Sequence, residues 1–342
     1  MKILIPSVQT PFIKGGAFYL ILGLENALKS RGYEVESVSL PFKFFPESFI
    51  SGMIDVWCGL DFNSFNGIDT DLAVVLQFPA YYVNHKNKVL WLMHQHRAVY
   101  DLYDAEKAEA GLKTLNEKIT ERDSSILPGI ASKFTISRNV SDRLLKFNGI
   151  DSVPLYHPPF GENNFYCGEP YDYIFYPSRL EGLKRQEMLI NAMKYVKSPV
   201  KAVIAGSGGL KKYLSYIIDK SNLNDRVRLI GAVSEDEKYV LYARCLSVVF
   251  CPQDEDYGYV TLEAMLSSKP LITCADSGGP LEFIEDGGSG FIAEPHPEAL
   301  AEKIDLLYRN KNKAKEMGKY ALESYRKKNI SWDNVVNRLL GI

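Results

Sequence analysis

The stretch SVVFCPQDEDYGYVTLEAMLSSKP, Ser247–Pro270, runs from an apolar strand through a glycine turn into a helix. SVVFCP reads as the end of a buried strand, YVTLEAMLSS has the apolar spacing of a helix, and Gly258 lies between them. A helix start offers unpaired backbone N–H groups and the positive end of the dipole, which suit phosphate or sugar hydroxyls. Glu255 precedes the turn and Glu263 lies about one and a half helical turns beyond it. We therefore predict a ligand site that one carboxylate reaches from the loop and the other from the helix.

The same strand and helix alternation continues through the whole second half of the chain. The apolar strand-like runs there are YIFYPS, VKAVIAGSG, RVRLIGAV, LSVVFCP and PLITCAD. Near-continuous apolar strands separated by helices are typical of a parallel sheet that is covered on both faces. This half is therefore predicted to be a doubly wound, Rossmann-like α/β domain.

The first half shows a similar order of elements. A strand at Lys2–Ser7 is followed by a glycine loop and a helix, and later strand-like runs are EVESVSL, DLAVVLQF, KVLWLMH and KFTIS. A polar helix is expected from about Tyr100 to Ile119. The segment Val153–Pro170 is dense in Pro and Gly and is read as the linker. We predict an N-terminal domain over residues 1–160, a C-terminal domain over 161–325, and a last helical segment over 326–342.

Composition excludes some partners and locations. The chain has 342 residues and a net charge of −2, which gives no reason to expect nucleic acid. The cysteines form no CxxC pair and the start MKILIPS has no signal-peptide features, so a reduced, cytoplasmic protein is expected. No apolar run reaches the roughly 20 residues needed to span a bilayer. PFKFFPESFI, Pro41–Ile50, is read first as a loop over the core, and peripheral contact with the cytoplasmic membrane face is the second option.

Two loops of the first half carry candidate binding residues. Gly15 and Gly16 allow close approach of a phosphate or acceptor, although two glycines in a loop often form only a turn. His94 and His96 follow a strand, and a single histidine there is more often structural than catalytic. With no third ligand nearby, a zinc site is not expected.

Three loops of the second half carry the others. Arg179 and Lys184 follow a strand and suit a diphosphate, because arginine grips phosphate with two parallel N–H bonds and lysine adds a mobile charge. The neighbouring Arg185 is expected to be an ordinary solvated surface residue. Gly206 begins a short glycine run after a strand and is expected to bound the nucleotide site. The run SGGP, Ser277–Pro280, allows a further close backbone approach. Because paired cations neutralise a diphosphate, no metal ion is required.

Together these loops resemble the nucleotide-sugar domain of glycosyltransferase family 4, a family of retaining enzymes with the GT-B architecture. The segments that carry the resemblance are SRLEGLKRQEMLINA, VIAGSGG, RVRLIGAVSEDEKYVLYARC, PQDEDYGYVTLEAMLSSKPLITCADSGGPLEFIEDGGSGFIAEP and SWDNVV. The first half resembles the family only in its glycine loop, in the histidine after the fourth strand-like run, and in SRNVSDRLLKFNGI. The resemblance implies two Rossmann-like domains whose parallel sheets face a cleft.

The resemblance also implies roles for single residues. Arg179 and Lys184 match the basic pair that binds the donor diphosphate. Glu255 matches the glutamate that contacts the donor sugar, and Glu263 matches the one that holds the ribose hydroxyls. The backbone turn beneath the sugar and phosphate corresponds to Gly258, Tyr259 and Val260.

In the first half, the resemblance assigns His94 to the active-site histidine near the transferred sugar, with His96 as the second choice. Gly16 corresponds to the loop that faces the phosphates. The helix beginning at Trp332 resembles the one that returns to the first domain.

The implied function is metal-independent, hexosyltransferase-type transfer, with retained configuration, from a nucleotide diphosphate sugar to a hydroxyl acceptor. The acceptor would be a carbohydrate or a lipid-linked molecule in bacterial-type polysaccharide or glycolipid assembly, and no cofactor besides the donor is expected. A sugar-nucleotide epimerase of the same architecture remains an alternative, as does a catalytically silent carbohydrate-binding subunit. The sequence leaves the base, the sugar and the acceptor open.

Overall fold

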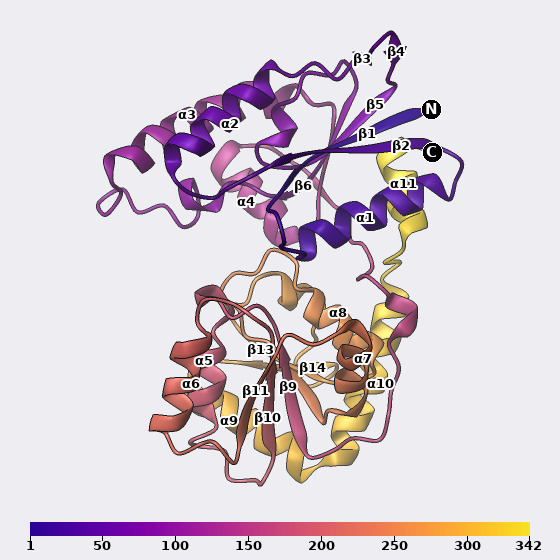
Figure 1. Ribbon diagram of the computed structural model, residues 1–342. Helices are drawn as coiled ribbons and strands as arrows, with labels where there is room; N and C mark the ends of the chain where they lie inside the picture. The colour runs from indigo at the N-terminus through magenta and orange to yellow at the C-terminus, as the bar shows by residue number, and fades with distance from the viewer. The chain divides into compact units, whose positions relative to one another are not determined.

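Two six-stranded parallel sheets form the centres of two units in the computed structural model, which describes residues 1–342 (Figure 1). Unit 1 contains Met1–Phe160 and Ser331–Ile342, and unit 2 contains Gly161–Ile330. Both sheets are flanked by helices, so the predicted α/β class with two Rossmann-like sheets is confirmed. None of the helices is both long and apolar enough to cross a membrane.

The sheet of unit 1 has the strand order β2-β1-β5-β6-β7-β8, and all its pairs are parallel. Its strands are β1 (Lys2–Gln9), β2 (Glu34–Pro41), β5 (Leu72–Gln77), β6 (Lys88–His94), β7 (Ser132–Thr135) and β8 (Val153–Pro154), with a separate hairpin of β3 (Ser64–Phe65) and β4 (Ile68–Asp69). Its helices are α1 (Gly16–Lys29), α2 (Glu47–Gly59), α3 (Ala110–Ile126), α4 (Arg138–Asn148) and α11 (Trp332–Leu340). The helix predicted to begin at Tyr100 therefore begins at Ala110 instead, because the chain around Tyr100 forms a 3₁₀ turn and further turns.

The last helix, α11, completes unit 1 by covering strands near its centre. It packs against α1, and Gly23 of α1 leaves room for the Trp332 ring, which lies 2.2 Å from where a Cβ would be. Trp332 also meets Trp91 of β6 edge-on, with ring centroids 6.4 Å apart. The chain end thus supplies helical cover that unit 1 needs to bury large aromatic side chains.

Unit 2 has the strand order β11-β10-β9-β12-β13-β14, again with parallel pairs throughout. Its strands are β9 (Tyr173–Pro177), β10 (Lys201–Ala205), β11 (Val227–Gly231), β12 (Ser247–Val249), β13 (Leu271–Cys274) and β14 (Gly290–Ala293). Its helices are α5 (Gln186–Ala192), α6 (Lys211–Lys220), α7 (Glu235–Arg244), α8 (Tyr259–Leu266), α9 (Pro297–Arg309) and α10 (Lys311–Lys327). The central strands β9, β12 and β13 are buried almost throughout, the edge strand β11 is partly exposed, and the sheet forms one apolar core with the inner faces of these helices.

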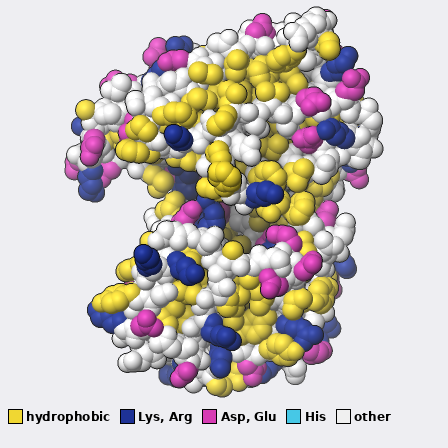
Figure 2. Space-filling model, viewed as in Figure 1, with side chains coloured by type: hydrophobic (Ala, Val, Ile, Leu, Met, Phe, Trp, Pro, Cys, Tyr) yellow, Lys and Arg dark blue, Asp and Glu magenta, His cyan; other side chains and the backbone are white.

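Surface charges of both signs are intermixed with apolar side chains over each unit on the face that Figure 2 shows. This mixture agrees with the nearly balanced total of 40 Lys and Arg against 42 Asp and Glu residues.

Candidate functional site

The strand order of unit 2 defines where a ligand would bind. The order in which strands are added to the sheet reverses between β9 and β12, the two central strands. From β9 the chain adds β10 and β11 on one side, and from β12 it adds β13 and β14 on the other. In open parallel sheets, ligands bind beyond the carboxyl ends of the strands at such a switch point. The loop after β9 carries Arg179 and Lys184, and the loop after β12 carries Glu255 and Gly258. The predicted residues thus occupy both sides of the switch point.

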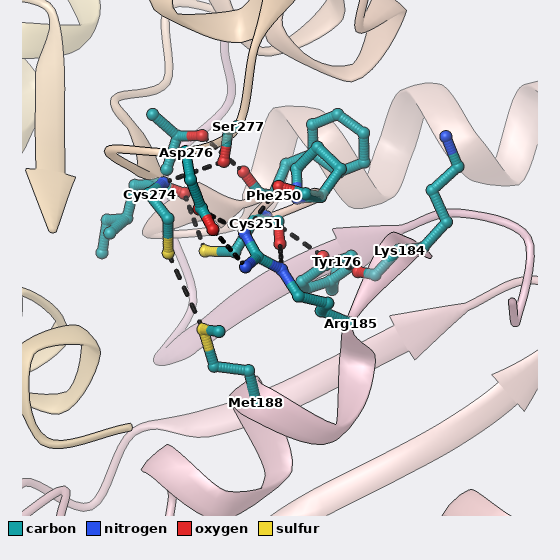
Figure 3. A network of polar contacts seen from close by, with 12 residues as sticks. Tyr176, Lys184, Arg185, Met188, Phe250, Cys251, Cys274, Asp276 and Ser277 are labelled. Carbon is teal, nitrogen blue, oxygen red and sulfur yellow. Dashed lines mark hydrogen bonds and ion pairs between the residues drawn. The ribbon is translucent and has the colours of Figure 1, made fainter. Parts of the chain in front are cut away.

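Arg185 ties three of the strand-end loops together (Figure 3). Its Nε donates to the carbonyl of Cys251 at 2.7 Å, and its Nη2 donates to the carbonyl of Pro252 at 2.6 Å. Both terminal nitrogens bond the two oxygens of Asp276, each at 2.7 Å. The expectation of a solvated surface residue is wrong, since the side chain is only 17% exposed and its hydrogen bonds hold the loops after β9, β12 and β13 in one arrangement.

Lys184 turns the other way and meets Glu255. The ammonium of Lys184 donates to Glu255 Oε2, and in Figure 3 it points away from the Arg185 cluster. The Glu255 backbone is fixed on both sides, because its N–H donates to the Ser277 carbonyl at 2.9 Å and its carbonyl accepts from Gly279 N–H at 2.8 Å. Tyr176 fixes the backbone of Lys184, since its hydroxyl donates to the Lys184 carbonyl. The structure therefore brings one predicted cation and one predicted carboxylate into contact.

Arg179 is held less firmly than Lys184. Its guanidinium pairs with Glu181 of the same loop at 2.8 Å, and its side chain is 55% exposed. The backbone around it is ordered by Gly206, whose φ is +145° and whose Cβ, if it had one, would lie 1.9 Å from the Ser178 carbonyl oxygen. Gly206 therefore lets the loop after β10 pack directly on the loop that carries Arg179.

Gly258 forms the predicted turn into the helix, and that prediction is confirmed. It is the N-cap of α8 with φ +86°, a left-handed conformation that favours glycine. A Cβ there would lie 2.9 Å from Pro280 Cγ, so the loop after β13 packs onto this turn. Tyr259 and Val260 are the first two residues of the helix, and the Val260 side chain packs on the core of unit 2.

Glu263 lies on α8 with both carboxylate oxygens engaged. Oε1 accepts from the ammonium of Lys238 at 3.1 Å, and Oε2 accepts from the Tyr242 hydroxyl at 2.6 Å. Lys238 also pairs with Glu235 at 2.8 Å. Burial opposes the charge of Lys238, but Glu263 and Glu235 outweigh it and raise the lysine pKa. Burial and the Glu263 charge raise the pKa of Tyr242, which keeps its hydroxyl a donor.

Sequence reasoning missed Lys238, Tyr242 and Arg185 as parts of the site. The first two lie one turn apart on α7, so they face the same direction. A lysine and a tyrosine at that spacing before a strand are common, however, and only the fold brings them to Glu263.

In unit 1, His94 and His96 have different surroundings. His94 ends β6, and its Nδ1 lies 2.7 Å from the Gln95 carbonyl, so Nδ1 carries the proton and Nε2 keeps its lone pair in the neutral ring. His96 is buried, its ring lies 4.9 Å from that of Phe78, and burial lowers its pKa to about 4. His96 is therefore a neutral packing residue at neutral pH.

Gly16 is the first residue of α1, directly after the N-cap Gly15. Gly16 and His94 belong to unit 1, whereas the other predicted residues belong to unit 2. No cluster of three or more His, Cys, Asp or Glu side chains that could hold a metal ion is found.

Residues 167–324, most of unit 2, match the model of the glycosyl transferases group 1 family. An uncharacterized glycosyltransferase of Methanocaldococcus jannaschii is 30% identical over 221 residues, which is 64% of this chain and 58% of the relative. The poly(ribitol-phosphate) alpha-N-acetylglucosaminyltransferase of Staphylococcus aureus is 32% identical over 173 residues, 48% of this chain and 34% of the relative. The chain thus spans less than two thirds of the length of these curated relatives.

The fold is similar to that of Anabaena HepE, whose structure was solved in complex with UDP and glucose. The two agree with a TM-score of 0.73 at 18% identity, and the comparison covers 100% of both chains. That likeness establishes the GT-B fold of the glycosyltransferases. Residues 167–324 thus match the group 1 glycosyl transferases, and the chain as a whole has a fold that is known from solved glycosyltransferase structures.

Proposed function

We propose that the chain transfers a glycosyl unit from a nucleotide diphosphate sugar to a hydroxyl acceptor, with retention of the anomeric configuration and without a metal ion. The main support is the meeting of Lys184 and Glu255 at the switch point of unit 2, beside the helix that carries Glu263. A cation and two separate carboxylates suit a ligand that has phosphates at its centre and hydroxyl groups at both ends.

In this proposal Lys184 and Arg179 bind the diphosphate. Negative charge grows on the diphosphate as the bond to the sugar breaks, and fixed cations stabilise that charge most in the transition state. Arg179 is exposed enough to move from Glu181 to a phosphate. These two cations take the part that a divalent ion plays in other enzymes.

The two glutamates serve as binding groups in this proposal. A glycosidase uses one carboxylate as acid and the other as nucleophile or base. Here each carboxylate already contacts a lysine, Glu255 with Lys184 and Glu263 with Lys238, and carboxylate oxygens accept hydrogen bonds from hydroxyl groups. We assign Glu255 to the donor sugar and Glu263 to the ribose.

Retention follows if the acceptor attacks from the side on which the diphosphate leaves. The bond from the anomeric carbon to the phosphate oxygen breaks, the bond to the acceptor oxygen forms on the same face, and the acceptor proton passes to the departing diphosphate. His94 is assigned to the transferred sugar, because the lone pair of its Nε2 can accept a hydrogen bond from a sugar hydroxyl. The Staphylococcus aureus relative is a poly(ribitol-phosphate) alpha-N-acetylglucosaminyltransferase, and its activity supports a carbohydrate or lipid-linked acceptor that offers a hydroxyl group.

The test begins with a panel of nucleotide sugars screened by thermal stabilisation. A donor at 100 times its dissociation constant adds about 2.7 kcal/mol to stability. With the donor found, Lys184→Met should lower turnover by orders of magnitude, whereas Lys220→Met on the exposed end of α6 should not. The proton coupling of the new anomeric centre, measured by NMR, reports retention.

Several results would contradict the proposal. Wild-type turnover of Lys184→Met would remove the diphosphate assignment, and an inverted product would remove the retaining mechanism. A donor that is isomerised without any acceptor would indicate an epimerase, and a chain that binds no nucleotide would indicate a silent subunit.

A further inference from the structure

Two loops of unit 1 present large apolar side chains to solvent. The loop between β1 and α1 carries Phe12 and Ile13, which are 105% and 52% exposed, and the loop between β2 and α2 carries Phe44 and Phe45, which are 63% and 72% exposed. Single exposed apolar residues are normal on a protein surface, but a group of them is a mark of an interaction site.

The two loops leave the sheet side by side. Gln9 and Pro41 are partners in the parallel register of β1 and β2, and the N–H of Phe42 donates to the Gln9 carbonyl at 2.9 Å. Phe42 itself is buried, and its ring meets that of Phe44 edge-on at 5.2 Å. The second loop is therefore anchored in the core by one phenylalanine while the next two stay outside.

Phe12 combines an exposed side chain with an unfavourable backbone conformation. Its φ is +66°, the left-handed region that bulky residues rarely adopt. No burial of its side chain compensates for that conformation, since the ring is fully exposed. Such a combination of strain and exposure points to a role outside the fold of unit 1.

The charge of the loops is positive. Lys14 and Lys43 are both exposed, and their ammonium groups lie 5.4 Å and 5.6 Å from the ring centroids of Phe18 and Phe49. Between Thr10 and Gly15, and between Phe42 and Pro46, the chain has no Asp or Glu. Aromatic rings enter the boundary between lipid headgroups and acyl chains, while lysine ammonium groups remain with anionic headgroups.

We propose that these two loops form a docking surface for the interface of an anionic lipid bilayer. This loop-tip surface consists of Phe12, Ile13, Lys14, Lys43, Phe44 and Phe45. The earlier interpretation of Pro41–Ile50 as core cover holds for Phe42 and Ile50, which are buried, and the adjacent residues supply the membrane contact. The inference goes beyond the transfer reaction, because it depends on no donor or acceptor.

The test is co-sedimentation of the full chain with vesicles of phosphatidylcholine, with and without phosphatidylglycerol, in the absence of nucleotide sugar. Wild type should bind the anionic vesicles. Lys14→Gln/Lys43→Gln should weaken that binding roughly 25-fold, about fivefold for each lysine. Phe44→Ser/Phe45→Ser should weaken it at least about tenfold, because two rings leave the interface.

The matched control is Phe65→Ser/Ile68→Ser on the β3–β4 hairpin of the same unit, whose side chains are also exposed, and it should bind like wild type. Wild-type chain that stays in solution would overturn the proposal, and so would a control that loses as much binding as the Phe44/Phe45 variant. Sedimentation equilibrium that shows a dimer dissociated by Phe44→Ser/Phe45→Ser, with unchanged vesicle binding, would assign the surface to a second copy instead. Since no nucleotide sugar is present, this test and the test of the transfer reaction fail independently.

Discussion

Replacing Arg185 by methionine should destabilise unit 2 by about 3.5 kcal/mol. The change leaves the carbonyls of Cys251 and Pro252 without their charged donor, and hydrogen bonds of that kind contribute roughly 1.5 to 3 kcal/mol each. We take the lower figure for both, because the arginine is partly solvated. The pair with Asp276, whose side chain is 42% exposed, adds only about 0.5 kcal/mol.

The expected loss is large enough to measure by calorimetry. Unit 2 has about 170 residues, so its unfolding entropy near 60 °C is about 0.36 kcal/mol per degree at roughly 2.1 cal/mol per degree and residue. A loss of 3.5 kcal/mol then lowers the midpoint of its transition by about 10 °C. The transition midpoint of Arg185→Lys should lie between those of wild type and Arg185→Met, since lysine keeps the charge but loses the forked geometry.

Arg179→Met is the matched control for this prediction. It removes an arginine from the same loop, but one that is mostly exposed and paired only with Glu181, so the expected loss is below about 1 kcal/mol. If Arg185→Met melted within about 3 °C of wild type, or no lower than Arg179→Met, the hydrogen bonds of Arg185 to Cys251, Pro252 and Asp276 would not stabilise unit 2, contrary to the prediction.

Two further outcomes follow from buried polar groups. Tyr242→Phe removes the hydroxyl that fixes Glu263 Oε2 and should reduce discrimination between ribo- and 2′-deoxyribonucleotide diphosphates by up to about tenfold; calorimetric titration that finds the wild-type ratio would contradict the positioning role. Burial lowers the pKa of His157 to about 3, so between pH 6.5 and 3 the unfolded chain binds a proton at this histidine that the native chain does not. The free energy of unfolding therefore decreases as the pH is lowered through this range, by up to about 1.4 kcal/mol per pH unit. His157→Phe should flatten urea-unfolding free energies between pH 6 and 4.5, apart from a similar contribution of His96, and an unchanged slope would exclude this cause.

The turn at Gly258 was predictable because its causes are local. A strand, a glycine and a helical pattern follow one another within a short stretch, and the structure starts α8 at Tyr259 with Gly258 in the left-handed region. Most strands of the parallel sheets were predictable for a related reason, since each of them shows its own apolar run. The short strands β8 and β14 were not predicted, and β8 lies in the segment that was read as the linker. Neither inference needs knowledge of a distant residue.

Helix boundaries in unit 1 failed where long-range contacts decide them. Tyr100 was assigned to a helix, but its hydroxyl donates at 2.6 Å to Asp123, which also accepts from Tyr81 and Tyr82. This buried cluster holds the chain around Tyr100 in turns, and α3 begins only at Ala110.

Helix α2 was missed for a different reason. Ile50, Ile54 and Trp57 have helical spacing and are buried. Because of the aromatic run before Pro46, however, Pro41–Ile50 was interpreted as a loop, although α2 begins at Glu47. The signal was present in the sequence, and the flanking residues obscured it.

The neighbours Lys184 and Arg185 show why residue type alone cannot assign a role. Arg185 has φ +49°, a left-handed conformation between a 3₁₀ turn and α5, so the backbone changes direction between two consecutive cations. One side chain turns toward Glu255 and the other toward Cys251, Pro252 and Asp276 (Figure 3). The partners of Arg185 lie 66 to 91 positions away in the chain. The loop thus places Lys184 against Glu255 and uses the next residue to fix its own position, and this division of roles depends on a backbone conformation that the amino-acid types do not reveal.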